Sequence, residues 1–88
     1  MFNIIKLNEK DNVAVSPMKI PLGSNINSEL KTIDEIPFGH KISLRDLKKG
    51  DLIYKYGQII GIAITDINRG SHVHSHNIEF HEFDRNYR

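Results

Sequence analysis

The chain has 88 residues, with twelve basic and eleven acidic side chains and a formal net charge of +1 at pH 7. This length suits one small domain, so we expect residues 1–88 to form a single unit. The absence of cysteine excludes a disulfide scaffold, a thiolate metal site and a cysteine nucleophile. The balanced charge disfavours a nucleic-acid surface, and no apolar run approaches the roughly 20 residues of a membrane span. We therefore expect a cytoplasmic protein that binds neither nucleic acid nor membrane.

Short apolar runs rich in Ile and Val alternate with Gly, Pro, Asn and Asp, a pattern typical of short strands and turns. The sequence predicts a mostly β fold with tight glycine turns and one or two short helical turns. The helical turn is expected at Ser43–Lys48, where Leu44 and Leu47 are three residues apart. The last residues, 81–88, are expected to form a flexible tail. In chain order, the predicted strands are Phe2–Leu7, Asn12–Val15, Lys31–Ile33, Lys41–Leu44, Asp51–Lys55, Ile59–Thr65, His72–His74 and Asn77–Phe80.

A weak internal repeat punctuates the chain. Each copy has an aliphatic residue, two others, Gly, two more residues and a second aliphatic residue. Glycine supplies the positive φ of a tight turn at little steric cost. The copies begin 16, 11 and 20 residues apart, so they predict a compact fold with many reversals and not a solenoid. They are Ile20–Ile26, Ile36–Ile42, Leu47–Ile53 and Ile67–Val73.

Three histidines near the end, His72, His74 and His76, alternate with Val73 and Ser75. Side chains two apart on a strand share a face, so a strand here would align three imidazoles. Such a face can hold a metal, move a proton or bind an oxyanion. The plainer alternative is an exposed polar strand face without a ligand. Two histidines alone do not close a metal site, so further ligands must come from elsewhere.

Taken together, these segments resemble the small domain of the altronate/galactarate dehydratase family, which has the SAF (β-clip) fold. That fold is also found in the antifreeze-like domains of sialic acid synthases. Two departures stand out: the family's much larger catalytic domain is absent, and Ser16–Lys19 replaces a longer apolar strand. The matching features are Asp11–Val15, Gly39-His40-Lys41, Leu44-Arg45-Asp46, Lys55-Tyr56-Gly57, Ile60-Gly61, Asp66-Ile67, Gly70 and Val73–Asn77.

The resemblance implies roles for individual side chains. A cysteine-free, histidine-rich site suits a divalent metal such as Fe(II) or Mn(II), and the resemblance points to these two. The structural alternatives are a surface role for His40, a solvated role for Lys55 and turn capping by Asp46. The implied roles are metal binding for His72, His74 and His76, substrate binding for Asn77 and Lys41, and catalysis for His40, Lys41 and Lys55.

The resemblance further implies a small subunit or N-terminal domain of a sugar-acid dehydratase. Such an enzyme removes water from a 2,3-dihydroxy acid to give a 2-keto-3-deoxy acid. The expected partners are a large catalytic subunit or domain and the sugar-acid substrate, with homo-oligomerisation left open. This chain alone is expected to be inactive. The alternatives are the small subunit of a (2R)-sulfolactate sulfo-lyase and a non-catalytic SAF module that binds ligand or scaffolds a partner.

Overall fold

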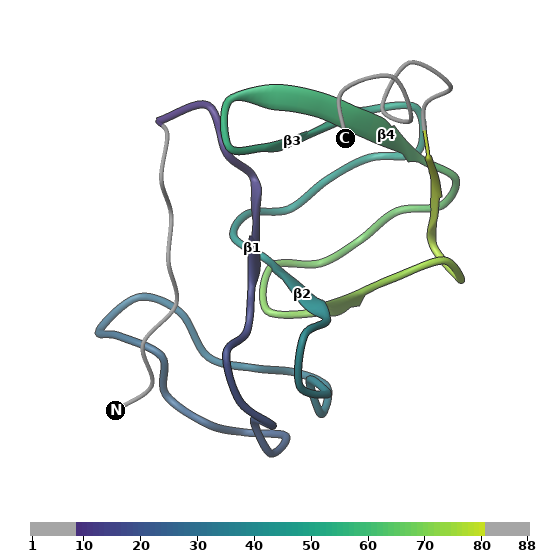
Figure 1. Ribbon diagram of the computed structural model, residues 1–88. Coiled ribbons are helices and arrows are strands. Elements are labelled where there is room, and N and C mark those ends of the chain that lie inside the picture. The colour runs from purple at the N-terminus through teal and green to yellow at the C-terminus, as the bar shows by residue number, and fades with distance from the viewer. Residues whose placement is uncertain (1–8, 81–88) are drawn as a thin grey trace.

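Six short strands form two three-stranded antiparallel sheets in the computed structural model, which describes residues 9–80 (Figure 1). The first sheet has the order β1-β2-β5, and the second has the order β3-β4-β6. None of the described residues belongs to a helix long and apolar enough to cross a membrane. The strands are β1 (Val13–Val15), β2 (Lys41–Ser43), β3 (Leu52–Lys55), β4 (Gln58–Ala63), β5 (His72–Val73) and β6 (Ile78–Phe80).

The mostly β prediction is confirmed, but the predicted helical turn at Ser43–Lys48 is wrong. Ser43 ends β2, a bend follows, and Leu47 then pairs with Ile67 through backbone hydrogen bonds of 2.7 and 2.8 Å. A helical turn would withdraw those groups from the partner. The predicted strand Lys31–Ile33 is reduced to one bridge between Asn25 and Lys31. The predicted strand at Phe2–Leu7 and the tail at 81–88 lie outside the described residues.

The four glycine turns are arranged as two pairs, which we call the first clip (residues 16–39) and the second clip (residues 43–70). In the first clip Ile20 and Ile36 exchange two backbone hydrogen bonds of 2.8 Å, as Leu47 and Ile67 do in the second. Every turn also has a small buried residue four positions before its aliphatic residue. The glycine N–H of each turn donates to the carbonyl of the small residue in the paired turn. These hydrogen bonds are Gly23 to Thr32 at 3.0 Å, Gly39 to Ser16 at 2.9 Å, Gly50 to Ala63 at 2.8 Å and Gly70 to Ser43 at 2.9 Å.

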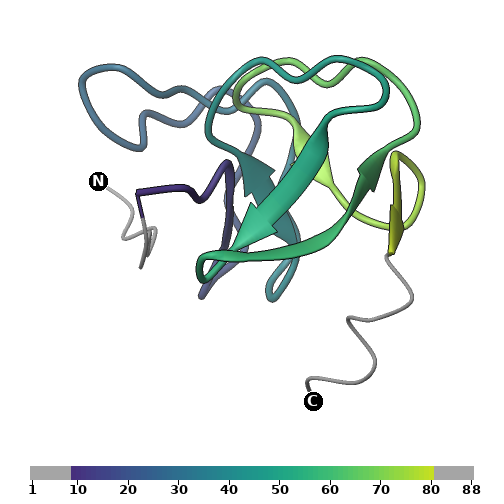
Figure 2. The same cartoon turned by 90° about the horizontal axis from the view of Figure 1, so that it is seen from above.

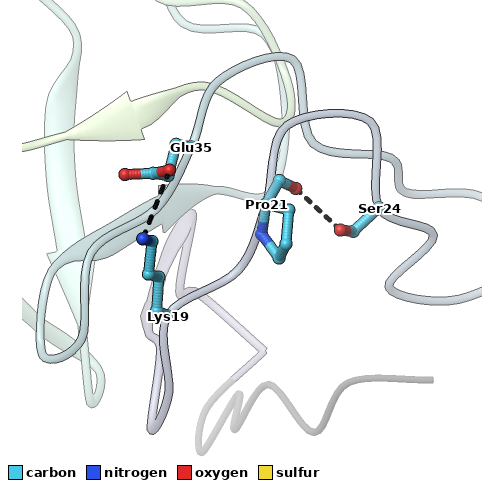
Figure 3. A network of polar contacts seen from close by, with 4 residues as sticks. All are labelled: Lys19, Pro21, Ser24 and Glu35. Atoms are coloured by element: carbon cyan, nitrogen blue, oxygen red, sulfur yellow. Dashed lines mark hydrogen bonds and ion pairs between the residues drawn. The ribbon is translucent and has the colours of Figure 1, made fainter.

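The segments between the turns of each clip differ. In the second clip, β3 and β4 form a hairpin, which provides two of the three strands of the second sheet. In the first clip, a mostly polar loop projects away from the sheets (Figure 2). Beside this loop, the Ser24 hydroxyl donates to the Pro21 carbonyl at 2.7 Å, and Lys19 pairs with Glu35 at 3.7 Å (Figure 3).

The sheet β1-β2-β5 separates two small cores. Side chains of residues paired across an antiparallel sheet lie on the same face, and Ala14, Ile42 and His72 are paired in one row. Ala14 and Ile42 belong to the core built with the first clip, so His72 lies on that face. The first-clip core comprises Ala14, Ile20, Ile26, Leu30, Ile36 and Ile42, and the second comprises Val13, Leu47, Ile53, Ile60, Ala63, Ile67, Val73 and Ile78.

The two clips meet at Gly70. The Ile33 N–H donates to the Gly70 carbonyl at 3.0 Å, and the His72 N–H donates to the Asp34 carboxylate at 3.0 Å. Gly70 has φ of 89°, and a Cβ placed on it would lie 2.2 Å from the Lys31 carbonyl oxygen. Only glycine therefore lets the two backbones approach here.

Candidate functional site: a histidine cluster where the two clips meet

A histidine follows the end of each clip, and these two histidines lie close together. His40 directly follows Gly39, the last residue of the first clip, and precedes β2. His72 follows Gly70 of the second clip by two residues and opens β5. Because β2 pairs with β5 through Lys41–Val73 and Ile42–His72, the residue before β2, His40, lies near both His72 and the residue after β5, His74.

Four imidazoles gather there: the ring of His72 is near the other three, and the ring of His40 is near those of His72 and His74. The ring centroid of His40 is 5.0 Å from that of His72 and 3.8 Å from that of His74, and all three rings are nearly parallel. His40 Nδ1 and His72 Nε2 are 2.8 Å apart, within hydrogen-bond distance. The ring of His76 is tilted beside His72, at 4.9 Å between centroids. We call these four residues the histidine cluster.

The predicted alignment of the imidazoles is only partly due to a strand. The strand β5 covers His72 and Val73, and a turn follows, so His76 reaches the cluster from that turn. His72 and His74 still flank the same ring, that of His40. His40 is 32 residues from His72, so no local spacing could have placed it there.

Asn77 braces the backbone of the cluster. Its Oδ1 accepts a hydrogen bond from the His74 N–H at 3.0 Å, and its Nδ2 donates to the His72 carbonyl at 2.9 Å. The side chain is buried, and both ends of its amide are engaged. Substrate binding by Asn77 stays a prediction. Asp34, which accepts from the His72 N–H, was not singled out in the sequence because its contact depends on how the clips pack.

The two predicted lysines have different positions. Lys41 pairs with Val73 in the sheet, is buried, and holds its Nζ 5.4 Å from the centre of the Phe80 ring. Burial, the neighbouring His40 and the charge of Lys41 all lower the pKa of His74. The substrate-binding and catalytic roles of Lys41 stay predictions.

Lys55 lies at the other end of the first sheet. It belongs to the β3–β4 hairpin, whose Gly57 N–H donates to Asp11 before β1 begins. His40, by contrast, pairs with Ser16 after β1 ends. Five residues of extended chain separate these contacts by about 16 Å. The structure therefore does not bring Lys55 to the histidine cluster.

Burial lowers the pKa values of His72 and His74. The neighbouring imidazoles lower the pKa of both residues further, while the Asp34 carboxylate opposes the effect at His72. Neutral rings are therefore favoured at pH 7, and a neutral imidazole has one nitrogen lone pair available to a proton or a metal. In the hydrogen bond between His40 and His72, one ring nitrogen donates and the other accepts.

Imidazole nitrogens are of the donor type that binds divalent metals. Within residues 9–80, no three His, Asp or Glu side chains are grouped so that they could hold one ion. His40 Nδ1 and His72 Nε2 are 2.8 Å apart, a hydrogen-bond distance that is shorter than the separation of about 3.4 Å between two tetrahedral ligands with metal–nitrogen bonds of about 2.1 Å. His74 Nδ1 is buried and has no hydrogen-bond partner among the described residues. The donor type therefore fits a divalent metal, but the described residues do not by themselves form a complete ligand set.

Comparison with known proteins gives the family. The altronate/galactarate dehydratase SAF domain matches residues 2–81. The chain is 40% identical over 76 residues to the altronate dehydratase of Escherichia coli (strain K12), and 39% identical over 80 residues to that of Bacillus subtilis (strain 168). These matches cover 83% and 88% of the chain but only 15% and 16% of those relatives.

A smaller relative matches over most of its own length. The (2R)-sulfolactate sulfo-lyase subunit alpha of Paracoccus pantotrophus is 43% identical over 53 residues, which cover 60% of this chain and 79% of that subunit. The small β fold of paired glycine turns and two sheets is consistent with the match to the SAF domain. The chain belongs to the altronate/galactarate dehydratase SAF domain family.

Proposed function

We propose that this chain is the SAF part of a sugar-acid dehydratase and contributes imidazoles to an active site that a larger polypeptide completes. The observation that carries the proposal is the histidine cluster, in which histidines that follow the two clips meet and one buried nitrogen, His74 Nδ1, has no partner among the described residues. A scaffold alone has no need for stacked, partly buried imidazoles. The larger polypeptide is either a separate subunit or the continuation of this chain.

The reaction would remove water from a 2,3-dihydroxy acid. The bond between the α-carbon and its hydrogen breaks and a base takes the proton, while the β-hydroxyl leaves and takes a proton to form water. The resulting enol rearranges to the 2-keto-3-deoxy acid. Imidazoles that are neutral at pH 7 suit the base and, once protonated, the acid. The ammonium of Lys41 would favour a negatively charged carboxylate close to the cluster.

A divalent metal, Fe(II) or Mn(II), is part of the proposal. His72, His74 and His76 would offer nitrogen ligands, His40 lies among them, and the remaining ligands would come from the larger polypeptide or the substrate. When bound, such a metal supplies a Lewis acid for the negative charge that develops on the substrate carboxylate. Removing it with a chelator should abolish turnover, and adding back Fe(II) or Mn(II) should restore it.

The test is turnover by the whole protein, as a two-subunit complex or as the continuous chain. It is assayed with altronate and galactarate in the presence of Fe(II) or Mn(II), and the 2-keto-3-deoxy product is quantified. We expect product from at least one acid, and none from the 88-residue chain alone. Failure of the metal-loaded whole protein to dehydrate either acid would contradict the proposal.

The second candidate is the small subunit of a sulfolactate sulfo-lyase. It is favoured by the match to 79% of the Paracoccus subunit alpha, a chain of similar size. The same removal of an α-proton would then expel sulfite in place of hydroxide. Sulfite release from (2R)-sulfolactate, without dehydration of sugar acids, would select this candidate. If neither activity appears and the chain still binds its partner, the non-catalytic SAF module is the correct description.

A further inference from the structure

An exposed aromatic ring lies next to the histidine cluster. Among the large hydrophobic side chains that the structure describes, Phe38 is the most exposed, at 73%. It occupies the turn Pro37–His40, in which the His40 N–H donates to the Pro37 carbonyl at 3.0 Å. Phe38 and His40 are two residues apart, so their Cα atoms are separated by at most about 7 Å.

The turn that holds Phe38 is fixed from several sides. Pro37 restricts its own φ, Gly39 adopts φ of 78°, and the Gly39 N–H donates to the Ser16 carbonyl at 2.9 Å. A ring held in place before binding loses little conformational entropy when a partner covers it. Phe38 is therefore a preorganised apolar anchor and not a side chain on a loose loop.

Met18 is a second exposed apolar side chain of the first clip. The pairing of Ile20 with Ile36, and of Ser16 with His40, places Met18 across from Phe38 in the first clip. Met18 is 40% exposed, and its backbone carbonyl accepts a hydrogen bond from the Ser16 hydroxyl. We call these two residues the Phe38–Met18 patch.

The first clip also contains an internal control. Leu22 occupies the position equivalent to Phe38, between a proline and a positive-φ glycine, and it is 68% exposed. Its turn leads into the loop of residues 24–31 and not into the histidine cluster. Exposure alone therefore follows from the shape of the clip, whereas proximity to His40 distinguishes Phe38.

We propose that the Phe38–Met18 patch is where the larger catalytic polypeptide docks on this domain, an inference that rests on the proposed function. The chain spans 15% and 16% of its dehydratase relatives, so most of such an enzyme lies outside it. A partner group that reaches His40 also comes close to Phe38, because their Cα atoms are at most about 7 Å apart. The partner should present an apolar pocket for an aromatic ring, next to the groups that meet the histidines.

Binding of the chain to the separately produced large polypeptide tests the proposal, with turnover as a second readout. If the two are parts of one chain, the large part is expressed without residues 1–88 and the domain is supplied in trans. Phe38→Ser should raise the dissociation constant by about 30-fold, and Met18→Ser should raise it by about threefold. Leu22→Ser should change it by less than twofold. Thermal unfolding of each variant confirms that the fold is intact.

Three outcomes would overturn the docking proposal. One is that Phe38→Ser binds within twofold of the wild type, and another is that Leu22→Ser weakens binding as strongly. The third is that Phe38→Ser abolishes self-association of the chain without changing its affinity for the large polypeptide, because a second copy would then occupy the patch. Binding that depends on Phe38 in a complex without dehydratase activity would support the docking site while contradicting the proposed function.

Discussion

The two clips use one hydrogen-bonded frame but secure it differently. In the second clip, the acid preceding each aliphatic residue caps the opposite turn: Asp46 accepts from the Arg69 N–H at 2.8 Å, and Asp66 accepts from the Lys49 N–H at 2.9 Å. The equivalent residues of the first clip, Lys19 and Glu35, instead form an ion pair with side chains 68% and 57% exposed. The frame thus depends on backbone pairing and small buried residues, and the side chains at its ends can vary.

The difference extends to what each clip positions. The second clip encloses a hairpin and shares its core with the second sheet, whereas the first clip has its own core and is followed directly by His40. The histidine cluster therefore depends on how the clips pack against each other, at Gly70 and Asp34. Substitutions at that junction should affect the site most, and substitutions at the outer ends of the clips should affect it least.

The largest effect on stability is expected for Gly70→Ala. A methyl group there meets the Lys31 carbonyl oxygen at 2.2 Å in addition to the strain of φ at 89°. The left-handed conformation costs a non-glycine residue about 1–2 kcal/mol, and the backbone shifts that relieve overpacking cost about 1–3 kcal/mol more. We expect a loss of about 3 kcal/mol or more in the free energy of unfolding, measured by urea denaturation.

Gly50→Ala is the matched control for Gly70→Ala. Gly50 has a similar φ of 94°, but a methyl group on it would meet no atom within 4 Å beyond its chain neighbours. Its loss should be about 1–2 kcal/mol, the cost of the conformation alone. Equal losses for the two variants would contradict a close contact between the clips at Gly70.

The next largest effect is expected for Asn77→Ala. Removing the amide leaves the His74 N–H and the His72 carbonyl without the partner they have in the structure. An unsatisfied buried polar group costs about 1–3 kcal/mol, so we expect a loss of about 2 kcal/mol in the free energy of unfolding. NMR shifts of the ring protons of His72 and His74 should change as well. Unchanged stability and unchanged shifts would show that Asn77 does not brace the cluster.

Smaller losses of stability are expected for substitutions at the ends of the clips, and they should be larger in the second clip than in the first. Asp46→Ala removes a cap from a backbone N–H and should cost about 1 kcal/mol, whereas Glu35→Ala removes only an exposed ion pair and should cost less than about 0.5 kcal/mol. Asp46→Asn retains the oxygen acceptor and should recover most of the loss. Thermal unfolding measures all three variants, and a larger loss for Glu35→Ala than for Asp46→Ala would contradict the comparison.

The pH dependence of stability provides a finer test. The folded-state pKa values of His72 and His74 are lowered, so the unfolded chain binds protons more readily than the folded chain as pH falls. The free energy of unfolding should therefore be fully retained above about pH 6.5 and decline below it, through the folded-state pKa values. Urea denaturation in a chelating buffer measures this. In the double variant His72→Gln/His74→Gln, the free energy of unfolding should fall less on acidification than in the wild type. A free energy of unfolding that rises on acidification from pH 7 would contradict the lowered pKa values of His72 and His74.

The sequence predicted the local features of this fold better than its long-range pairing. The four turn glycines and most strands follow from composition and spacing, and the turn-capping role expected for Asp46 is confirmed. The pairing of turns within each clip was missed, although small residues four positions before each aliphatic residue were a signal for it. Ser43–Lys48 was wrongly predicted as helical because the spacing of its leucines is also compatible with non-helical chain whose partner is distant in sequence.

The candidate site shows the same division. The alternation of residues predicted that His72 and His74 lie on one face. Only the family resemblance singled out His40, because it contacts His72 from a position 32 residues away in the sequence. Lys55 was placed with the site by resemblance alone, and the hairpin directs it to the opposite end of β1. Contacts set by packing between the clips were beyond reach from local sequence.

The most direct test of the histidine cluster is kcat/KM of the whole protein after substitution of its rings. His40→Ala and His74→Ala should each lower kcat/KM by about 100-fold or more, within the range for loss of an acid–base group. Ser75→Ala, on an exposed residue between two of the cluster histidines, should retain activity. Values for both histidine variants within threefold of the wild type, in a folded and assembled protein, would contradict a catalytic role for the cluster.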